Sequence, residues 1–363
     1  MGQVEITFVV PAYNAENTIA RTIESILYQT DERYKIIIVN DGSTDATEQI
    51  CQRYAERYPQ KIGYAYQTNR GLGGARNHGM KLVKTEYVSF LDSDDWLMPE
   101  YVEKVLLQIM NHIENPPEMI KILPRIYNEN SKVVSDWYDK ELFEQLFQRE
   151  GQIINPQEEI KIFRTDVSQC RNVFRMEFLR RVHFQFREKV KWEDVYPHFF
   201  LLSQCHTCMG IRSVGFYYRK GSKNQITATR GKDRMDLLIV YDDLIQYVKK
   251  GVFPKDLEME LKFSIMRIMI TFAMEGIRMA DMDTRKELVQ KLKFFFKNVH
   301  GSFYQYFIRE CRNSCTKKEI VQYWLFLFVI RQQLSSRMLW DYLYKETGEK
   351  IIKKILRMNK RKI

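Results

Sequence analysis

The chain has 363 residues, of which 45% are hydrophobic and 28% charged; this excludes a disordered or fibrous protein and leaves room for one large or two ordinary folded domains. Its formal net charge of +11 indicates an acidic partner, either nucleotide phosphates or an anionic membrane, and because no nucleic-acid-binding motif accompanies the charge we expect no nucleic acid. We expect no signal peptide, and the apolar run at 323–330 is shorter than the roughly 20 residues of a membrane-spanning helix, so a cytoplasmic protein with reduced cysteines is expected.

The first third of the chain alternates between short apolar runs and segments with helical spacing. These patterns predict, in order, strand 6–10, helix 17–29, strand 35–40, helix 44–58, strand 63–67, helix 71–83 and strand 87–91. Elements at this spacing form right-handed βαβ units, so the predicted fold class is α/β, a Rossmann-like and mostly parallel sheet with flanking helices. The carboxyl ends of its strands should share one edge, where open parallel sheets bind ligands.

An acidic turn follows the last of these strands. Asp92, Ser93 and Asp94 come directly after the apolar run, so two carboxylates stand one residue apart. Such carboxylates repel each other unless a cation neutralises them, and oxygen ligands suit Mg²⁺ or Mn²⁺, which usually complete their shell with substrate phosphates. Taken alone, the triplet is more often a loop and a helix N-cap.

The other strand ends carry groups that suit a nucleoside diphosphate. Tyr13 offers a ring against which a base can lie, Asp41 is an acceptor for the N3–H of uracil, and Arg76 can pair with a phosphate. The glycine-rich turn at 71–74 lets the backbone approach a ligand closely. Each feature also has a structural alternative, in packing, a turn or a loop, but their occurrence at consecutive strand ends favours a ligand site. The chain has neither the Gly-x-Gly-x-x-Gly fingerprint after its first strand nor a P-loop.

Four segments resemble the serial motifs of family 2 glycosyltransferases with the GT-A fold: Val10-Pro11-Ala12-Tyr13-Asn14, Val39-Asn40-Asp41-Gly42-Ser43, Gly73-Gly74-Ala75-Arg76-Asn77-His78-Gly79 and Phe90-Leu91-Asp92-Ser93-Asp94-Asp95. The resemblance covers about the first 100 residues closely and is of the bacterial cell-surface polysaccharide or teichoic-acid type. It implies a nucleotide-sugar donor, most often a UDP-sugar, a Mn²⁺ or Mg²⁺ ion, and transfer with inversion of the anomeric configuration.

The resemblance also implies roles for individual residues. Pro11, Tyr13 and Asp41 would hold the base, Arg76 and Asn77 would lie near the donor, and Asp92 and Asp94 would serve the ribose and the metal; which of those two carboxylates touches the ion stays open. The full predicted donor site is Pro11, Ala12, Tyr13, Asn14, Asp41, Gly73, Arg76, Asn77, Asp92, Ser93 and Asp94.

A second acidic pair, Glu193-Asp194, supplies the candidate catalytic base. An inverting displacement needs one base to take the proton from the acceptor hydroxyl. The pair resembles the family's ED motif, in which the aspartate is the base, so Asp194 is the first candidate and Glu193 the second. Without the family, the same residues could equally begin a helix.

The third protein ligand of the metal stays open. Residues 214–219 predict a strand that leads into a loop where related enzymes sometimes carry a metal-binding histidine, but this chain has Gln225-Ile226-Thr227 and no histidine there. Arg219, Lys220 and Lys223 could instead help neutralise the diphosphate, although a solvated basic loop explains them equally well.

From Asp233 onward, apolar residues recur at helical spacing. We therefore expect a GT-A domain over 1–230 and an all-α domain over 231–363 that contacts the acceptor, a second subunit, a partner transferase or a membrane. The segment 350–362 has seven basic residues and no acidic one, which suits peripheral contact with an anionic membrane on its cytoplasmic face; a packed helix with a frayed basic end is the alternative.

The leading hypothesis is therefore an inverting, metal-dependent hexosyl- or N-acetylhexosaminyl-transferase. Its donor would be a UDP-sugar, and its acceptor a hydroxyl of a glycan, a polyol-phosphate polymer or a lipid-linked saccharide. Two alternatives stay open: a sugar nucleotidyltransferase, which would need a glycine-rich and basic loop after the first strand, and a non-catalytic scaffold for a partner transferase.

Overall fold

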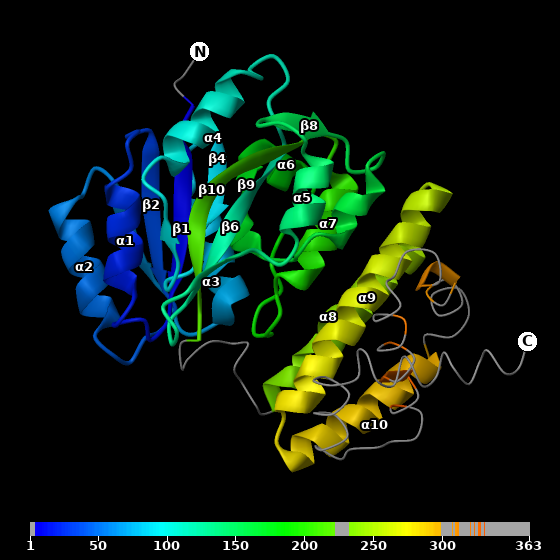
Figure 1. Ribbon diagram of the computed structural model, residues 1–363. Helices are drawn as coiled ribbons and strands as arrows, with labels where there is room; N and C mark the ends of the chain where they lie inside the picture. Colours follow the sequence, from blue (N-terminus) through cyan, green and yellow to red (C-terminus); the bar gives the residue numbers. More distant parts are fainter. Residues whose placement is uncertain are drawn as a thin grey trace, which may run out of the picture. The chain divides into compact units, whose positions relative to one another are not determined.

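The computed structural model describes residues 4–221 and 232–298, with the single positions 307, 309–311, 320, 323, 326–327 and 330 beyond them. The chain separates into two compact units, residues 1–225 and 226–363. Figure 1 shows a sheet flanked by helices in the first unit and helices in the described part of the second. The predicted fold class, an α/β domain followed by a helical region, is confirmed.

Four parallel strands form one half of the sheet in the first unit. Their spatial order is β3 (Ile62–Tyr66), β2 (Tyr34–Asn40), β1 (Ile6–Ala12) and β4 (Tyr87–Phe90). Every residue of β1 is buried, because this strand is central and both of its faces are covered. These strands lie within a few residues of their predicted bounds, and their carboxyl ends share one edge of the sheet, as predicted.

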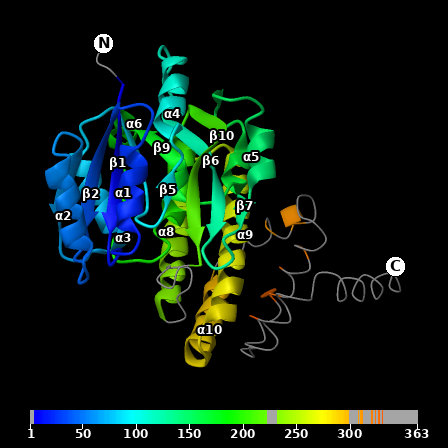
Figure 2. The ribbon, with the colours of Figure 1, turned by 60° about the vertical axis from the view of Figure 1, so that its left-hand side comes forward.

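Helices cover both faces of this half. The helices α1 (Ile19–Leu27), α2 (Thr47–Arg57) and α4 (Tyr101–Met110) share a hydrophobic core with Phe8 and Val10 of β1. Helix α1 lies against β1 and β2 in both views of the ribbon (Figures 1 and 2). On the opposite face, α3 (Gly71–Leu82) packs so closely that a Cβ on Gly79 would lie 2.3 Å from Val9 Cγ1.

The other half of the sheet mixes parallel and antiparallel pairs. The antiparallel strand β9 (Asn172–Arg175) lies between β4 and β6 (Met119–Asn128), and β10 (Cys208–Lys220) runs parallel to β6. Part of β10 is the strand predicted over 214–219, whereas β9 was not predicted, because Asn172 and Arg175 leave it only two consecutive apolar residues. The remaining elements of this half are β5 (Trp96–Leu97), β7 (Val134–Asp136), α5 (Lys140–Leu146), β8 (Gln152–Ile154), η1 (Ile160–Arg164), η2 (Gln169–Arg171), α6 (Met176–Arg181) and α7 (Val195–Gln204).

The second unit is helical over its described part. It contains η4 (Lys232–Met235), α8 (Asp236–Lys250), α9 (Lys255–Met279) and α10 (Met282–Asn298). Arg285 of α10 is buried and donates to the carbonyl oxygens of Ile277 and Ala280 at 2.7 and 2.6 Å. A cation that binds the last carbonyl groups satisfies acceptors that a helix end leaves open, so Arg285 ties the end of α9 to α10.

Two predicted features lie outside the described residues: the loop with Lys223 and Gln225-Ile226-Thr227, and the basic segment 350–362. Within the described part of the chain, a search for a helix with the length and hydropathy of a membrane span finds none.

A buried lysine lies in the second half of the sheet. Lys121 of β6 has no exposed surface, and its ammonium group donates to Asn172 Oδ1 at 3.3 Å. Burial and the nearby Arg171 guanidinium lower the pKa of Lys121 to about 8, although Cys208 and the carboxylates of Asp139 and Asp166 act in the opposite direction. The folded state therefore binds this proton less tightly than the unfolded state does.

We expect Lys121→Met to stabilise the protein at neutral pH by on the order of 2 kcal/mol, because the variant buries no charge. The penalty in the native protein is fully present below pH 8 and disappears as pH rises toward the unfolded value of 10.5, since the buried lysine loses its proton first. The difference in melting temperature between the variant and the native protein should therefore shrink between pH 8 and pH 10.5. The exposed Lys161→Met is the control and should show no such trend. A pH-independent gain at Lys121 would contradict the assignment.

Candidate active site

The acidic turn after β4 is held from inside the fold. The Asp95 backbone N–H donates to the Asp92 carbonyl oxygen at 3.1 Å, which closes the turn. Thr22 of α1 donates its hydroxyl to the Asp95 carbonyl oxygen at 2.8 Å. The carboxyl groups of the turn are therefore presented at the edge of the sheet by a fixed backbone.

Arg76 of α3 joins the two acidic motifs. Its Nη2 lies 2.8 Å from Asp92 Oδ1 and its Nη1 lies 2.7 Å from Glu193 Oε1. The side chains of Arg76 and Glu193 are 2% and 4% exposed, whereas that of Asp92 is 27% exposed. Burial opposes the charge of the guanidinium, but the Asp92 and Glu193 carboxylates outweigh it and raise the pKa of Arg76. The sequence suggested that Arg76 pairs with a phosphate; in the structure both of its terminal nitrogens bind protein carboxylates.

The residues beside Arg76 hold the segment that leads to Glu193. Asn77 exchanges two hydrogen bonds with the backbone of Phe186, donating to its carbonyl at 2.9 Å and accepting from its N–H at 2.8 Å. A Cβ on Gly73 would lie 2.2 Å from the Arg187 carbonyl oxygen. Gly73 therefore makes room for the protein's own backbone at Arg187, and Asn77 holds that backbone in place through Phe186.

Asp94 and Asp95 differ in their surroundings. Asp95 is fully buried, and its Oδ1 accepts the Arg219 backbone N–H at 2.9 Å. Its buried Oδ2 has no hydrogen-bond partner among the residues that the structure describes. Asp94 is partly buried, and burial together with the Asp92 carboxylate raises the pKa of Asp94 to about 6. Burial, together with the Asp94 and Asp92 carboxylates, also raises the pKa of Asp95. Burial is the larger cause of both pKa shifts, and the neighbouring carboxylates add to it; a cation at this place would offset their negative charge.

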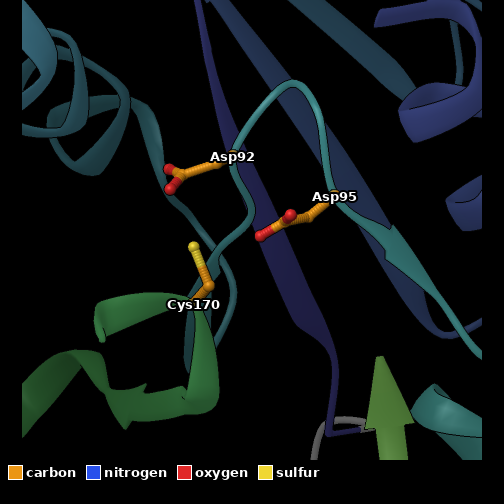
Figure 3. Close-up of side chains that lie close together, drawn as sticks. All are labelled: Asp92, Asp95 and Cys170. Atoms are coloured by element: carbon orange, nitrogen blue, oxygen red, sulfur yellow. The ribbon is translucent and has the colours of Figure 1, made fainter. Parts of the chain in front are cut away.

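The thiol of Cys170 lies beside the acidic turn. Asp92, Asp95 and Cys170 each offer one ligand atom, and these atoms all lie within 4.8 Å of one another (Figure 3). The predicted metal pair was Asp92 and Asp94, so the structure adds two residues that the sequence reasoning did not select. Asp95 carried a signal, since it belongs to the same acidic run. Cys170 carried none, because the short helix η2 brings it from a distant part of the chain.

Asp194, the candidate catalytic base, lies at the start of a helix. Asp194 is the last residue before α7, its side chain is partly buried, and its carbonyl oxygen accepts a hydrogen bond from Gln169 Nε2 at 3.0 Å. Burial and the adjacent Glu193 carboxylate raise the pKa of Asp194, while Arg76 acts in the opposite direction. Trp192, two residues before it, has a φ of +66°, a strained conformation of the kind that clusters at functional sites.

The residues predicted to hold the nucleobase of the donor lie at the ends of β1 and β2. The Tyr13 side chain is 50% exposed, while Pro11 and Ala12 are buried in β1. Asn14, with a φ of +48°, accepts the Thr44 N–H at 2.8 Å and so joins the two loops.

Asp41 is only 3% exposed, and its Oδ1 accepts from Gln67 Nε2 at 2.7 Å and from the Arg70 N–H at 2.8 Å. Within the described part of the chain, the structure gives its Oδ2 no hydrogen-bond donor, so this atom can accept one from a ligand. Ser93, the remaining predicted donor contact, is partly buried in the acidic turn.

An arginine that the sequence reasoning did not consider lies against Trp96, the residue that follows Asp95. The Arg21 guanidinium of α1 is 3.4 Å from the centre of the Trp96 ring, and Tyr217 stacks on the same ring at 5.3 Å. The predicted Arg219 is the next residue but one along β10, with its guanidinium 5.7 Å from the Trp96 ring centre. Of these two arginines, Arg219 is the one whose charge acts on the Asp94 and Asp95 carboxylates.

Residues 7–182 match the model of the family described as "Glycosyl transferase family 2". Glycosyltransferase GlyA of Streptococcus pneumoniae is 43% identical over 108 residues, which are 30% of this chain and 15% of that protein. The minor teichoic acid biosynthesis protein GgaB of Bacillus subtilis is 41% identical over 104 residues, 28% of this chain and 12% of that protein. The matched segments are thus small parts of much longer relatives.

Solved structures share the fold over nearly the whole chain. S. aureus TarS 1–349, solved in complex with UDP, superimposes with a TM-score of 0.64 at 17% identity and covers 93% of this chain and 91% of that chain. The mannosyltransferase PcManGT from Pyrobaculum calidifontis, in complex with GDP-Man and Mn²⁺, gives a TM-score of 0.54 at 14% identity over 94% of this chain and 86% of that chain. At these identities the likeness establishes the fold, which is GT-A.

Proposed function

Because residues 7–182 belong to glycosyltransferase family 2, we propose that the protein transfers a hexosyl or N-acetylhexosaminyl group from a UDP-sugar to an acceptor hydroxyl, with inversion. The acceptor would be a cell-surface glycan, a polyol-phosphate polymer or a lipid-linked saccharide. One observation carries the proposal: the buried Arg76 holds the acidic turn and the Glu193-Asp194 pair together at the carboxyl edge of the sheet. The names of two similar proteins agree with it, since TarS was also solved with UDP-GlcNAc and GgaB is named for teichoic acid biosynthesis.

In the proposed donor complex, uracil lies against the exposed Tyr13 ring and its N3–H donates to Asp41 Oδ2. Asp41 suits this role because Gln67 and the Arg70 N–H already fix its other oxygen. A buried acceptor that is held in place rejects a base without a matching donor, since an unmatched pair would leave a polar atom without a partner. Cytosine has no N3–H, so the arrangement favours uridine nucleotides.

The acidic turn suits a divalent cation, because Asp95 Oδ2 is buried without a hydrogen-bond partner among the described residues and the Asp94 and Asp92 carboxylates lie nearby. Asp92 and Asp94 are the ligands proposed from the sequence, with Mn²⁺ or Mg²⁺ as the ion. When bound, the ion would neutralise charge that develops on the departing diphosphate. The base rather than the ion takes the proton.

In the proposed reaction, Asp194 accepts the proton of the acceptor hydroxyl while the acceptor oxygen bonds to the anomeric carbon. The bond from that carbon to the diphosphate breaks on the opposite face, and UDP leaves with the electron pair. The raised pKa of Asp194 suits a base that must take a proton from an alcohol. Arg76 acts as a positioning residue, because its two terminal nitrogens bind the Asp92 and Glu193 carboxylates and leave none for the substrate.

The division of labour within the chain is also a proposal. Residues 1–230 would form the transferase domain, and 231–363 would serve contact with the acceptor, a second copy, a partner transferase or an anionic membrane surface at its cytoplasmic face. The basic segment 350–362 that motivates the membrane contact lies beyond the described residues.

We expect UDP, but not GDP, CDP or ADP, to raise the melting temperature, and Mn²⁺ to increase the effect. A ligand at 100 times its Kd stabilises a folded protein by about 2.7 kcal/mol, which a thermal unfolding scan resolves. Tyr13→Ala should weaken the response to UDP, whereas Tyr28→Ala, which removes a ring that is 74% exposed away from the site, should not. Unchanged melting with every nucleotide would favour a non-catalytic scaffold over an enzyme.

A further inference from the structure

The acidic turn lies in a region with more negative than positive groups. Its carboxyl groups come from Asp92, Asp94, Asp95, Glu193 and Asp194, and the guanidinium groups that act on them are those of Arg76 and Arg219. Arg76 already divides its two terminal nitrogens between Asp92 and Glu193. Buried carboxylates in excess of their counter-charges need either protons or a cation.

The carboxyl group of Asp95 has one buried oxygen that the described residues leave without a hydrogen bond. Asp95 is 0% exposed, and within the described part of the chain its Oδ2 has no hydrogen-bond partner. Figure 3 shows its carboxyl group directed toward the Cys170 sulfur, with Asp92 on the adjoining stretch of the turn. An unpaired buried oxygen costs free energy that a ligand at this position would recover.

Cys170 is the neighbour that distinguishes this place from an ordinary carboxylate site. Its side chain is 4% exposed, and its ligand atom lies within 4.8 Å of those of Asp92 and Asp95. Burial, followed by the Asp92 and Asp95 carboxylates, raises the pKa of Cys170, so the residue is a thiol until a cation displaces its proton. Thiolate ligands favour Zn²⁺ and Cd²⁺ strongly over Mg²⁺.

We propose that Asp92, Asp95 and Cys170 bind a divalent cation through two carboxylate oxygens and one thiolate, which makes the site selective for thiophilic ions. On binding, the metal–sulfur bond forms and the S–H bond breaks, with its proton released to solvent; the ion is not reduced or oxidised. Three protein ligands leave at least one position open, which water or a diphosphate oxygen can fill. Only that last role rests on the proposed function, since the ion itself binds without a donor.

The proposal is tested by titrating the reduced, metal-free full-length chain with CdCl₂ and recording the ultraviolet sulfur-to-cadmium charge-transfer band. We expect a band that saturates at one equivalent, that is absent in Cys170→Ala, and that persists in Cys51→Ala. Cys51 is a matched control because it is also a buried free thiol of the same hydrophobic cluster, but among the described residues only Cys170 groups with Asp92 and Asp95. A band that persists in Cys170→Ala, or no band in the native chain, would overturn the proposal.

Competition with Mg²⁺ gives a second readout. In Cys170→Ser, which keeps a hydroxyl in place of the thiol, we expect affinity for Cd²⁺ to fall on the order of tenfold or more while affinity for Mg²⁺ changes little, because a hydroxyl is a poor ligand for soft ions. Equal losses for both ions would indicate a structural role of the side chain and contradict the assignment. Asp95→Asn should abolish the band, but because Asp95 is buried its folding must be checked, and Cys170→Ser decides the question if it fails to fold.

The outcome is separable from that of the proposed function. A cadmium band without any response to UDP would sustain the cation site and count against glycosyl transfer. Stabilisation by UDP with Mn²⁺ in a chain that gives no cadmium band would support glycosyl transfer and count against the thiolate site. The ion would then be held by the oxygen ligands Asp92 and Asp94.

Discussion

Replacing Asp194 by asparagine is expected to lower the transfer rate by about 10²- to 10⁴-fold, the range that a positioned general base contributes. An amide has nearly the shape of a carboxylate but cannot accept the proton of the acceptor hydroxyl. The backbone hydrogen bond from Gln169 to the Asp194 carbonyl oxygen does not depend on the side chain, so the start of α7 should stay in place. Melting temperature and stabilisation by UDP should therefore remain close to those of the native chain.

The measurement is the initial rate of sugar transfer from a UDP-sugar, taken with each variant at several pH values. The rate of the native enzyme should rise with pH through a value well above the usual range of an aspartate, because burial and Glu193 raise the pKa of Asp194 and only the unprotonated form is a base. Glu193→Gln is the comparison variant. If Glu193→Gln shows the 10²- to 10⁴-fold loss of rate that is expected of Asp194→Asn, and Asp194→Asn remains active, the catalytic base is Glu193.

Replacing Arg76 by methionine is expected to reduce the free energy of unfolding by about 3–5 kcal/mol, the cost of breaking a buried ion pair from one side. The substitution leaves Glu193, which is 4% exposed, and the less buried Asp92 without their shared cation. Arg76→Lys should recover little, since one ammonium group cannot present two separated nitrogens to two carboxylates. Activity should fall as well, because the two acidic motifs lose the residue that fixes their separation.

Chemical denaturation measures this effect, and the chain offers a matched control. Arg70 pairs with Glu188 at 2.6 Å, but those side chains are 43% and 30% exposed, so Arg70→Met should cost less than about 1 kcal/mol. The double variant Arg76→Met with Glu193→Gln should regain part of the loss, since it removes one of the unpaired charges. A loss at Arg76 no larger than that at Arg70 would mean that the buried pairs do not hold the site together.

The parallel half of the fold was predictable because its signals are local. A central strand that is buried on both faces reads as an uninterrupted apolar run, as in β1 and β2, and the intervening helices carry their own periodicity. The place of the acidic turn followed from topology alone, since the carboxyl ends of parallel strands meet at one edge. The antiparallel strand β9 had no comparable signal, because polar residues at both of its ends leave only two consecutive apolar residues.

The contacts inside the site were not predictable in the same way. The sequence selected Arg76 for its charge, but one of its two partners, Glu193, comes from the segment that returns past α3 more than a hundred residues later. The same segment explains Gly73, whose lack of a side chain makes room for the Arg187 carbonyl group rather than for a ligand. Cys170 is a thiol without a motif, and only the fold brings it to Asp92 and Asp95.

The close contact between α3 and β1 limits how the site can change over evolutionary time. Gly79 is pressed against Val9, so any side chain there would lift the helix from the sheet. Arg76 stands three residues earlier on the same helix, and its reach to Asp92 and Glu193 depends on the helix staying where it is. A descendant of this protein could acquire a new sugar specificity by altering exposed loops such as that of Tyr13, but a single added methyl group at Gly79 would displace the charged framework that every such descendant shares.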